Sequence, residues 1–513
     1  MISAYTLAWE RHLCPFKNEI PMNAVPPIRI RKINDASVND KGCYILYWMI
    51  SNRRVRCNFS LQRAVEWAVR LKKPIVVLEA LRSGYPWASD RFHRFIIDGM
   101  ADNIRMLQNH GFVHYYPYVE PHADAGKGLL ANLAKESCIV ITDDFPAFFL
   151  PKMVDAASKK IPVKLEAVDS NGLLPLRGTD RTYPTAFAFR RLLQKVLPDH
   201  LLAYPEIDPL KGLRLPAAVA PPETILKRWP EALNLMENGE VDLGRIPINH
   251  NVPPSRLKGG AREARKRLLE FIHRRLSGYE TDRNHPDEDA ASGLSPYLHF
   301  GHISAHEVFQ EIADSEEWFI HKLSEKAQGK KYGWWGMRAS AEAFLDELVT
   351  WRELGYNMCV FRKDYAQYES LPDWAKATLL THEMDRRPYL YDRAALEDAQ
   401  THDPLWNAAQ RQLVREGRIH NYLRMLWGKK ILEWSLSPRE AVEVMIELNN
   451  KYALDGRDPN SYSGIFWCLG RYDRPWGPER PILGKVRYMS TKNTARKLRI
   501  QDYLAAWGPE VEL

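Results

Sequence analysis

The sequence has 513 residues, of which 45% are hydrophobic and 27% are charged, so the chain can bury more than one core. This composition excludes a disordered or fibrous protein. The 72 Lys and Arg exceed the 64 Asp and Glu, and the net charge is +8. Such an excess fits a face that binds polyanions, but it more often reflects an ordinary basic surface.

The six cysteines are scattered along the chain without a CxxC pair. This argues against a zinc site or a disulfide framework and favours a reducing compartment. The N-terminal stretch carries charges where a signal peptide needs an apolar run, and no run reaches 18 consecutive apolar residues. We therefore expect a soluble, intracellular protein that does not enter a membrane.

Residues 27–175 alternate short β-rich apolar runs with amphipathic helical runs. This alternation predicts βαβ units, hence a Rossmann-like α/β domain with a parallel sheet and helices on both faces. No GxGxxG follows the first strand, which excludes a conventional dinucleotide site there. The expected strands are 43–50, 73–81, 113–119, 138–145 and 163–170, and the expected helices between them are 58–71, 89–111, 127–137 and 149–160.

The pattern of the remaining residues predicts a connector followed by a second domain. Prolines punctuate residues 176–258, so we expect a long, partly helical connector on the surface. Residues 259–500 carry helical patterns almost throughout, which predicts an all-α domain. Its expected helices include 261–276, 340–361, 404–417, 418–434 and 437–454.

The helical run 418–434 places polar groups beside indoles. Asn421 and Arg424 share the run with Trp427 and Trp434, which are seven residues apart. Two turns of helix put both indoles on one side, about 10 Å apart along the axis. Packing in an aromatic-rich core explains most tryptophans of this chain, but not necessarily those beside charges.

Two further motifs could hold a ligand. In 292–304, small hydroxyls and free backbone N–H groups at a helix start suit a phosphate, although an ordinary N-cap with Pro296 at N1 explains them as well. In 344–357, Glu347, Trp351 and Leu354 fall at i, i+4 and i+7. A carboxyl group flanked by aromatic rings could bind a ligand or donate a proton, while a Glu paired with a basic residue at the edge of a core is the commoner case.

The C-terminal motifs are also ambiguous on their own. In 452–467, Asp455, Asp458 and Asn460 crowd a Gly/Pro loop, where Asx-turn chemistry explains at least one of them. The stretch 480–497 interleaves basic with aromatic residues, which fits either a phosphate-contacting strip or a solvated basic tail.

Taken together, six motifs resemble the C-terminal half of class II cyclobutane pyrimidine dimer photolyases. They are ASGLSPYLHFGHIS, FLDELVTWREL, THDPLWNAAQ, HNYLRMLWGKKILEW, LDGRDPNSYSGIFW and GKVRYMS, and the N-terminal CYILYWMISNRRVRCNFSL resembles the start of the same enzymes. The resemblance runs from about residue 27 to about residue 498. Residues 1–26 have no counterpart in the family, and the segment 326–340 is long and carries an unusual pair of tryptophans.

The resemblance implies FAD, active in its reduced form, in the helical domain. An antenna chromophore of unknown identity is possible in the α/β domain. Asn421 occupies the position of an adenine contact in other photolyase classes, whereas class II members usually have Gly there. Implied contacts to the FAD phosphates and ribityl chain are Tyr279, Ser292, Gly293, Leu294 and Ser295; Arg424 and Asp455 match an ion pair beside the flavin ring; Asn449 and Asn460 are both candidates for the amide that faces flavin N5.

The resemblance also implies a light-driven electron transfer from reduced FAD to a flipped-out dimer in UV-damaged DNA. Glu347 matches the carboxyl group that hydrogen-bonds the thymine carbonyl edge and stabilises the added charge. Trp427, Trp406 and Trp434 match the tryptophan chain that leads from the flavin towards solvent. Implied substrate or DNA contacts are Trp351, Trp467 and Met425 at the dimer, with Arg283, Asn284 and Arg487 at the vacated space or the backbone.

We expect a monomer that works on DNA, in the cytoplasm at the nucleoid of a bacterium or archaeon, or in the nucleus of a eukaryote. One alternative is a cryptochrome-type blue-light receptor without repair, which would be expected to lose Glu347, Trp351 or Trp467. A second is repair of the (6-4) photoproduct, which calls for active-site histidines. A third is a DNA-binding helical domain fused to a Rossmann-like domain, without light chemistry.

Overall fold

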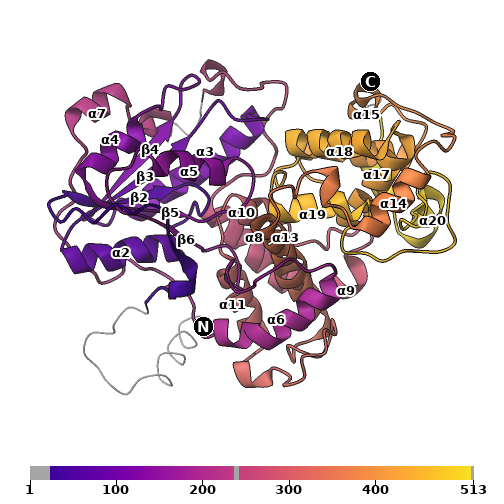
Figure 1. Ribbon diagram of the computed structural model, residues 1–513, viewed down its shortest axis with the longest axis horizontal. Coiled ribbons are helices and arrows are strands. Elements are labelled where there is room, and N and C mark those ends of the chain that lie inside the picture. The colour runs from indigo at the N-terminus through magenta and orange to yellow at the C-terminus, as the bar shows by residue number, and fades with distance from the viewer. Residues whose placement is uncertain (1–23, 236–241, 510–513) are drawn as a thin grey trace.

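The computed structural model describes residues 24–235 and 242–509. Within these ranges the chain forms a sheet covered by helices, with a second, helical part beside it (Figure 1). The expectation of an α/β part followed by an all-helical part is therefore confirmed. Cys14 and the charged N-terminal stretch lie outside the described residues.

The sheet has the strand order β1-β6-β5-β2-β3-β4. Neighbouring strands are parallel except for β1 and β6, which are antiparallel. All five predicted strands form, whereas β1 was not predicted because a three-residue edge strand has too short a pattern to detect. The strands are Ile30–Lys32 (β1), Tyr44–Met49 (β2), Ile75–Leu81 (β3), Val113–Val119 (β4), Ser137–Asp143 (β5) and Leu165–Val168 (β6).

Alternate side chains of β2 enter two different cores, because successive residues of a strand point to opposite faces. Ile45 and Tyr47 pack with α2, and Leu46 and Trp48 pack with α4 and α5. Helices α2 and α4 accordingly lie on opposite sides of the sheet in Figure 1. The helices of this part are Phe59–Leu71 (α2), Asp90–Leu107 (α3), Leu129–Glu136 (α4) and Leu150–Ser158 (α5), after a 3-10 turn at Pro27–Arg29.

The proline-rich segment is only partly the surface connector that the sequence predicts. Its helix α6 (Ala186–His200) buries Phe189, Leu193 and Leu197 in the core that also holds α8 (Ala261–Arg274) and α11 (Ala305–Ser315). Prolines mark the chain reversals, but the apolar face of α6 is part of the helical domain. The other elements of the segment are Glu223–Arg228 (α7) and 3-10 turns at Ala232–Leu235 and Leu243–Arg245.

The helical part begins at α8, and the predicted helices are confirmed with small shifts. The run 418–434 starts three residues later, at Asn421, and the run 340–361 is interrupted by a π-helical segment. The helices are Ala261–Arg274 (α8), Tyr279–Asp282 (α9), Ser295–His299 (α10), Ala305–Ser315 (α11), Ala339–Leu345 (α12), Arg352–Phe361 (α13), Asp373–Thr381 (α14), Arg393–Glu397 (α15), Pro404–Glu416 (α16), Asn421–Trp434 (α17), Pro438–Tyr452 (α18), Pro459–Trp467 (α19), Thr491–Lys497 (α20) and Gln501–Ala506 (α21), with 3-10 turns at Leu276–Gly278, Ile320–Lys322 and Tyr368–Ser370.

A buried arginine joins the two parts. Arg91 of α3 is 1% exposed, and its guanidinium donates to the backbone carbonyls of Tyr452 (2.8 Å) and Val414 (2.7 Å) in the helical part. A charge-assisted hydrogen bond is stronger than a neutral one, so these contacts fix the helical part against α3. Burial lowers the pKa of Arg91 to about 10, which still leaves it charged near neutral pH.

A buried carboxyl group joins α13 to the segment that follows β6. Glu353 is 4% exposed and accepts the backbone N–H groups of Leu173 (2.7 Å) and Leu174 (3.0 Å). Burial raises the pKa of Glu353 to about 7, while Arg352 and these N–H groups oppose the rise. In the unfolded chain the same carboxyl group titrates at about 4.5, so the folded state holds its proton to higher pH.

We expect the stability of the protein to fall as the pH rises from about 5 to about 8, by about 3 kcal/mol from Glu353 alone. A raised folded-state pKa contributes stability that is present below the unfolded pKa and is lost as the pH rises through the folded pKa. Glu353→Gln has no titrating group there and should lose this contribution to the slope. Denaturant unfolding of both proteins across this range measures it, and parallel curves would contradict the assignment.

Candidate functional site

A π-helical segment, Asp346–Trp351, interrupts the helical run between α12 and α13. The sequence predicts an uninterrupted helix with Glu347, Trp351 and Leu354 on one face. In the structure Leu354 is fully buried, whereas Glu347 is 31% exposed in its side chain and Trp351 is half-buried. A π-helical turn inserts an extra residue and occurs frequently at functional sites. It explains why Glu347 and Trp351 face solvent while the next turn faces the core.

Glu347 forms an ion pair with Arg283, the residue that caps the C-terminal end of α9. The distance between Arg283 Nη1 and Glu347 Oε1 is 2.5 Å. The guanidinium of Arg283 lies 5.5 Å from the ring centre of Tyr279. Burial and the charge of Glu347 raise the pKa of Tyr279 well above its usual range. Burial lowers the pKa of Arg283, but Glu347 outweighs this effect and raises it overall.

Two indoles, one on the π-helical segment with Glu347 and one on α19, come from segments that pack together. Helices α13 and α19 approach so closely that a Cβ on Gly355 would lie 2.8 Å from the carbonyl oxygen of Pro459. Trp351 lies about one helical turn before Gly355 and Trp467 about two turns after Pro459, and both indoles are half-buried. Met425 of α17 approaches α19 at Gly464, where a Cβ would lie 3.9 Å from the Met425 methyl group. Two indole faces and a thioether thus come from three helices that pack together.

Cations surround Trp467. Lys429 is 1% exposed, its ammonium donates to the carbonyl of Cys468 (2.7 Å), and it lies 5.0 Å from the ring centre of Trp467. Burial lowers the pKa of Lys429 to about 8. Arg487 lies 5.5 Å from the same ring and is held by Asp473 through two hydrogen bonds of 2.8 and 3.1 Å. The predicted contact residue Arg487 is therefore already oriented beside Trp467.

Three tryptophans from two helices are in contact. Asp403 caps α16 by accepting the N–H of Trp406 (3.0 Å), which starts the helix at the position that brings this indole to α17. The Nε1–H of Trp406 donates to the backbone carbonyl of Trp427 (3.0 Å), and the rings of Trp406 and Trp434 are 5.5 Å apart. Trp427 donates to Gln410 (2.9 Å). The sequence therefore correctly predicts that these three indoles lie together.

The tryptophan chain was expected to lead towards solvent, but its last member, Trp434, is buried. Trp434 is only 2% exposed, so it does not itself reach the surface. It contacts Tyr391 and His402, with ring centres 5.5 and 5.2 Å away. Tyr389 stacks on His402 at 3.7 Å and is 48% exposed. Aromatic rings therefore continue from Trp434 to the surface.

The loop 292–295 lies against Arg267 of α8. Gly293 has φ +66°, a conformation that favours Gly, and a Cβ there would lie 2.8 Å from Arg267 Nη1. The hydroxyl of Ser292 accepts the N–H of Leu294 (3.3 Å), and Ser295 is exposed at the start of the five-residue helix α10. The four residues 292–295, which were predicted to contact FAD, thus form one tight loop beside the guanidinium of Arg267.

The remaining predicted residues lie on α17, α18 and α19. Arg424 pairs with Asp455 at 3.3 Å, which confirms the proximity that the sequence analysis expects. Asn421 is exposed at the first turn of α17. Asn449 is 2% exposed and donates to Ser461 (2.8 Å), whereas Asn460 is exposed in the first turn of α19. Asn284 is half-buried, directly after Arg283.

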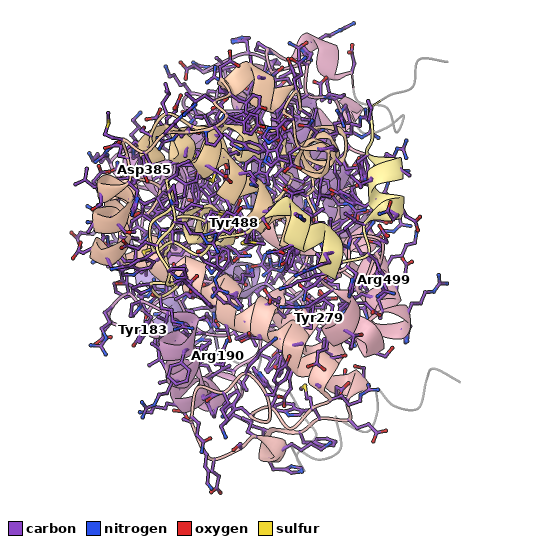
Figure 2. All side chains as sticks on the ribbon, turned by 90° about the vertical axis from the view of Figure 1, so that its right-hand side faces the viewer. Tyr183, Arg190, Tyr279, Asp385, Tyr488 and Arg499 are labelled. Carbon is purple, nitrogen blue, oxygen red and sulfur yellow. The ribbon has the colours of Figure 1, made fainter. Side chains whose placement is uncertain are left out.

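The chain directly after the basic strip 480–497 lies beside α9. Arg499 pairs with Asp282 of that helix at 3.3 Å, and Arg499 and Tyr279 appear near each other in Figure 2. Lys492, Arg496 and Lys497 of α20 are exposed. The Arg499–Asp282 pair therefore brings the chain just after these exposed cations to the helix that Arg283 caps.

Known proteins resemble this chain over nearly its whole length. A deoxyribodipyrimidine photo-lyase of Methanothermobacter thermautotrophicus is 33% identical over 477 residues, which cover 93% of this chain and 97% of the relative. One of Arabidopsis thaliana is 31% identical over 502 residues, with 94% and 93% covered. The chain belongs to the photolyase/cryptochrome family. None of the family models compared with the sequence matches it.

Solved structures of the family have the same fold. A class III photolyase of Agrobacterium tumefaciens has a TM-score of 0.60 at 17% identity and covers 92% of this chain and 88% of its own. A cryptochrome of Synechocystis has a TM-score of 0.60 at 15% identity, with 91% and 89% covered. At these identities the likeness shows the photolyase/cryptochrome fold alone.

Membership of the photolyase/cryptochrome family implies FAD as the cofactor, and two buried polar atoms of this chain fit it. Arg267 Nε, beside Gly293, and Arg424 Nε, beside Asp455, are buried without a hydrogen-bond partner. An unpaired buried donor costs about 1–3 kcal/mol unless a ligand or water satisfies it. A guanidinium with a free N–H suits a phosphate at Arg267 and an electron-rich ring edge at Arg424. The loop 292–295 and the Arg424–Asp455 pair would therefore hold FAD.

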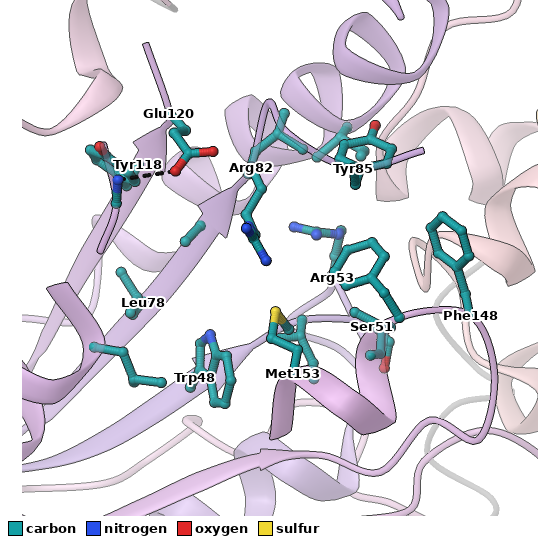
Figure 3. A pocket seen from close by; sticks show the side chains of 18 of the residues that line it. Trp48, Ser51, Arg53, Leu78, Arg82, Tyr85, Tyr118, Glu120, Phe148 and Met153 are labelled. Atoms are coloured by element: carbon teal, nitrogen blue, oxygen red, sulfur yellow. Dashed lines mark hydrogen bonds between the residues drawn. The ribbon is translucent and has the colours of Figure 1, made fainter. Parts of the chain in front are cut away.

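A cavity of about 310 Å³ opens at the carboxyl ends of the parallel strands (Figure 3). It is called the second cavity below, because it is separate from the site around Glu347. Ligands of open α/β sheets bind at this edge. Trp48, Leu78 and Met153 supply apolar walls, and Arg53 and Arg82 reach into the space between them. His299, Phe300 and Arg457 close it from the helical part.

Several residues of the two sites were not predicted from the sequence. Arg267 and Lys429 lie in ordinary helical patterns, where nothing distinguishes them from surface cations. The residues of the second cavity had a usable signal, because Ile50 ends a predicted strand and Arg82 and Glu120 each directly follow one. Within the described residues, none of the helices is long and apolar enough to cross a membrane.

Proposed function

We propose that the protein is a class II cyclobutane pyrimidine dimer photolyase that repairs UV-damaged DNA in light. The observation that carries this proposal is the close packing of α13 on α19, which brings together the segment that holds Glu347 and the half-buried Trp351 and the helix that ends at the half-buried Trp467. The names of the two long relatives support it, because both are deoxyribodipyrimidine photo-lyases.

The two indoles receive the flipped dimer in this proposal. Flipping costs a few kcal/mol, and less for a damaged base that pairs poorly. Stacking on Trp351 and Trp467 returns about 1–3 kcal/mol per base. Met425 packs on the dimer from α17. Lys429 and Arg487 hold Trp467 in place by cation–π contacts, so this wall is formed before DNA binds.

Bound reduced FAD supplies the electron that light drives onto the dimer. Trp427, Trp406 and Trp434 carry electrons towards the FAD site when the cofactor arrives oxidised. Indole is the most readily oxidised common side chain. A hydrogen bond from Trp406 to the backbone of Trp427 and a ring contact between Trp406 and Trp434 keep the three indoles close together. Tyr391 and His402 connect this chain to the surface. Asn449 and Asn460 are the two candidates for the amide that faces flavin N5. Asn421 is the candidate contact to the adenine of FAD.

The basic strip binds the DNA backbone. Lys492, Arg496 and Lys497 are exposed, so they are available to phosphates. In this proposal Arg283 and Asn284 enter the space that the flipped bases leave. Phosphate contacts position the duplex without reading its sequence. Binding by the monomer should therefore weaken with salt and be largely indifferent to flanking sequence.

We also propose that the second cavity holds an antenna chromophore. Flat apolar walls at Trp48 and Leu78 suit an aromatic ring, and Arg53 and Arg82 suit an acidic group on it. The absorption spectrum of material extracted from the purified protein checks this point. A spectrum with FAD as its sole chromophore, unchanged after incubation with candidate chromophores, would contradict it.

The proposed function is tested by lesion selectivity. Purified, dithionite-reduced protein is illuminated with an equal mixture of two oligonucleotides, one with a thymine dimer and one with a (6-4) photoproduct. We expect intact thymines from the dimer alone. Restoration of the (6-4) lesion would favour that chemistry, and no repair by FAD-loaded protein would favour a blue-light receptor. Protein that stays colourless after FAD is added would favour a DNA-binding role without light chemistry.

A further inference from the structure

The loop 323–338, which leads to α12, carries a basic surface that the proposed function does not use. It contains four basic residues and a single acidic residue, Glu325. Lys326 and Lys330 are exposed, and Lys331 is half-buried. In the described part of the chain, no carboxylate forms an ion pair with any of these three ammonium groups. The three lysines are therefore free to meet an anion from outside the protein.

The backbone of this loop is fixed to α6 and to the core of the helical part. Gln194 of α6 accepts the backbone N–H of Gly329 (2.7 Å) and donates to the carbonyl of Lys330 (2.9 Å). Trp334 and Trp335 are 4% and 7% exposed and anchor the following residues in the core. A segment that is ordered before binding loses little conformational entropy when a ligand binds.

Helix α6 adds two cations to the same surface. A Cβ on Gly329 would lie 3.2 Å from the Cβ of Arg191, so this arginine lies directly beside the loop. Lys195 follows one helical turn later, on the same side of α6. Both side chains are exposed, and neither pairs with a carboxylate of the described residues. The α6 patch is the name used below for Arg191, Lys195, Lys326, Lys330 and Lys331.

The α6 patch borders the segment that holds Glu347. Lys330 and Lys331 line a small cavity together with Asp346, which directly precedes Glu347. Arg190 of α6 pairs with the same Asp346 at 2.7 Å. The patch therefore lies next to the residues that would meet a flipped dimer.

The basic strip 480–497 reaches the same site from another side. Arg499, just after the strip, pairs with Asp282 of α9 at 3.3 Å. In Figure 2, Tyr279 of α9 lies between Arg190 of α6 and Arg499. Cations therefore lie on both sides of α9, and a duplex whose lesion enters the site at its centre would pass both groups.

We propose that the α6 patch binds phosphates of the duplex on one side of the lesion, while the strip 480–497 binds those on the other side. This inference rests on the proposed function and adds a second, separate contact with DNA to it. A duplex carries one negative charge per about 1.7 Å of its axis, so several phosphates would face the patch. Such contacts position the duplex without reading its sequence. With both arms held, the direction of the duplex across the site is fixed.

The salt dependence of binding measures the contribution of the patch. A fluorescently labelled duplex with a central thymine dimer is titrated in the dark with the FAD-loaded full chain at several salt concentrations. In Lys330→Gln/Lys331→Gln, the slope of log affinity against log salt should become shallower by about 1–2 units, because each lost phosphate contact removes about 0.9. Lys159→Gln/Lys160→Gln is the matched control. This exposed lysine pair at the end of α5 should leave the slope unchanged.

The length of the duplex arms provides a second test. Shortening one arm to about three base pairs, or roughly 10 Å, removes the phosphates that would face the patch. This change should weaken binding by the wild type several-fold but affect Lys330→Gln/Lys331→Gln little. Shortening the other arm should weaken both proteins equally. Arg191→Gln/Lys195→Gln changes the helix and leaves the loop intact, and it should behave like the loop variant.

The outcomes separate the patch from the proposed function. An unchanged salt slope in both patch variants, at preserved preference for the dimer-containing duplex, would overturn the patch alone. The same conclusion would follow if each shortened arm weakened the wild type and the patch variants to the same extent. Equal affinity of the wild type for damaged and undamaged duplexes would instead overturn the proposed function.

Discussion

The Trp406→Phe variant should lose nearly all of the light-driven reduction of its oxidised cofactor. Trp406 is fully buried and touches both neighbours, with its Nε1–H on the carbonyl of Trp427 and its ring 5.5 Å from Trp434. A phenyl ring is much harder to oxidise than an indole, so the middle of the chain would be interrupted. The measurement is the absorbance of FAD under blue light with an external thiol as the final donor.

Trp335→Phe provides the control for this variant. Trp335 is also buried and packed against other aromatic rings, but it lies in a different core, next to Trp318 and Trp334. It should leave photoreduction unchanged. Trp406→Phe should also repair dimers normally once dithionite has reduced it. Unchanged photoreduction in Trp406→Phe would remove these tryptophans from the electron path.

The Glu347→Ala variant should show the opposite pattern. Its ring-opening step should slow about 10²-fold, because removal of one group that stabilises developing charge typically costs that much. FAD should remain bound, since Glu347 lies at Arg283 and not at the loop 292–295 or the Arg424–Asp455 pair. The measurement is the number of dimers repaired per absorbed photon by the dithionite-reduced protein.

Glu311→Ala is the matched control for this variant. Glu311 is 25% exposed in its side chain and pairs with Arg265 at 2.9 Å, so it resembles Glu347 in exposure and partner. Its repair yield should equal that of the wild type. A normal yield in Glu347→Ala would place the stabilising group elsewhere. Together the two tryptophan and two glutamate variants separate reduction of the cofactor from repair of the lesion.

The sheet was predictable because each of its central strands is a short, fully buried run. Tyr44–Met49 is buried at all six positions, so it reads as a continuous apolar segment between turns. The edge strand Ile30–Lys32 has one half-buried and two exposed residues, and such a segment has no apolar pattern. Helix α6 was partly missed for a different reason. Proline spacing suggested a surface path, while Phe189, Leu193 and Leu197 packed into the helical core.

The candidate site was predictable where single positions carry the chemistry. Trp406, Trp427 and Trp434 come together as expected, and so do Arg424 and Asp455. Pairings between distant segments were not predictable, because spacing along the chain does not report them. Arg283 and Glu347 were assigned to DNA and dimer separately, yet they form one ion pair across 64 residues of sequence. The π-helical turn at Asp346–Trp351 likewise depends on packing and not on composition.

The central claim is light-driven dimer repair, and repair of a thymine-dimer oligonucleotide by purified, reduced protein tests it most directly. Two identical samples are incubated, one under blue light and one in darkness, and intact thymines are quantified in each. The account predicts restoration under light, none in darkness, and a much lower yield per photon for Glu347→Ala. Repair in darkness, or no repair by protein that holds reduced FAD, would contradict it.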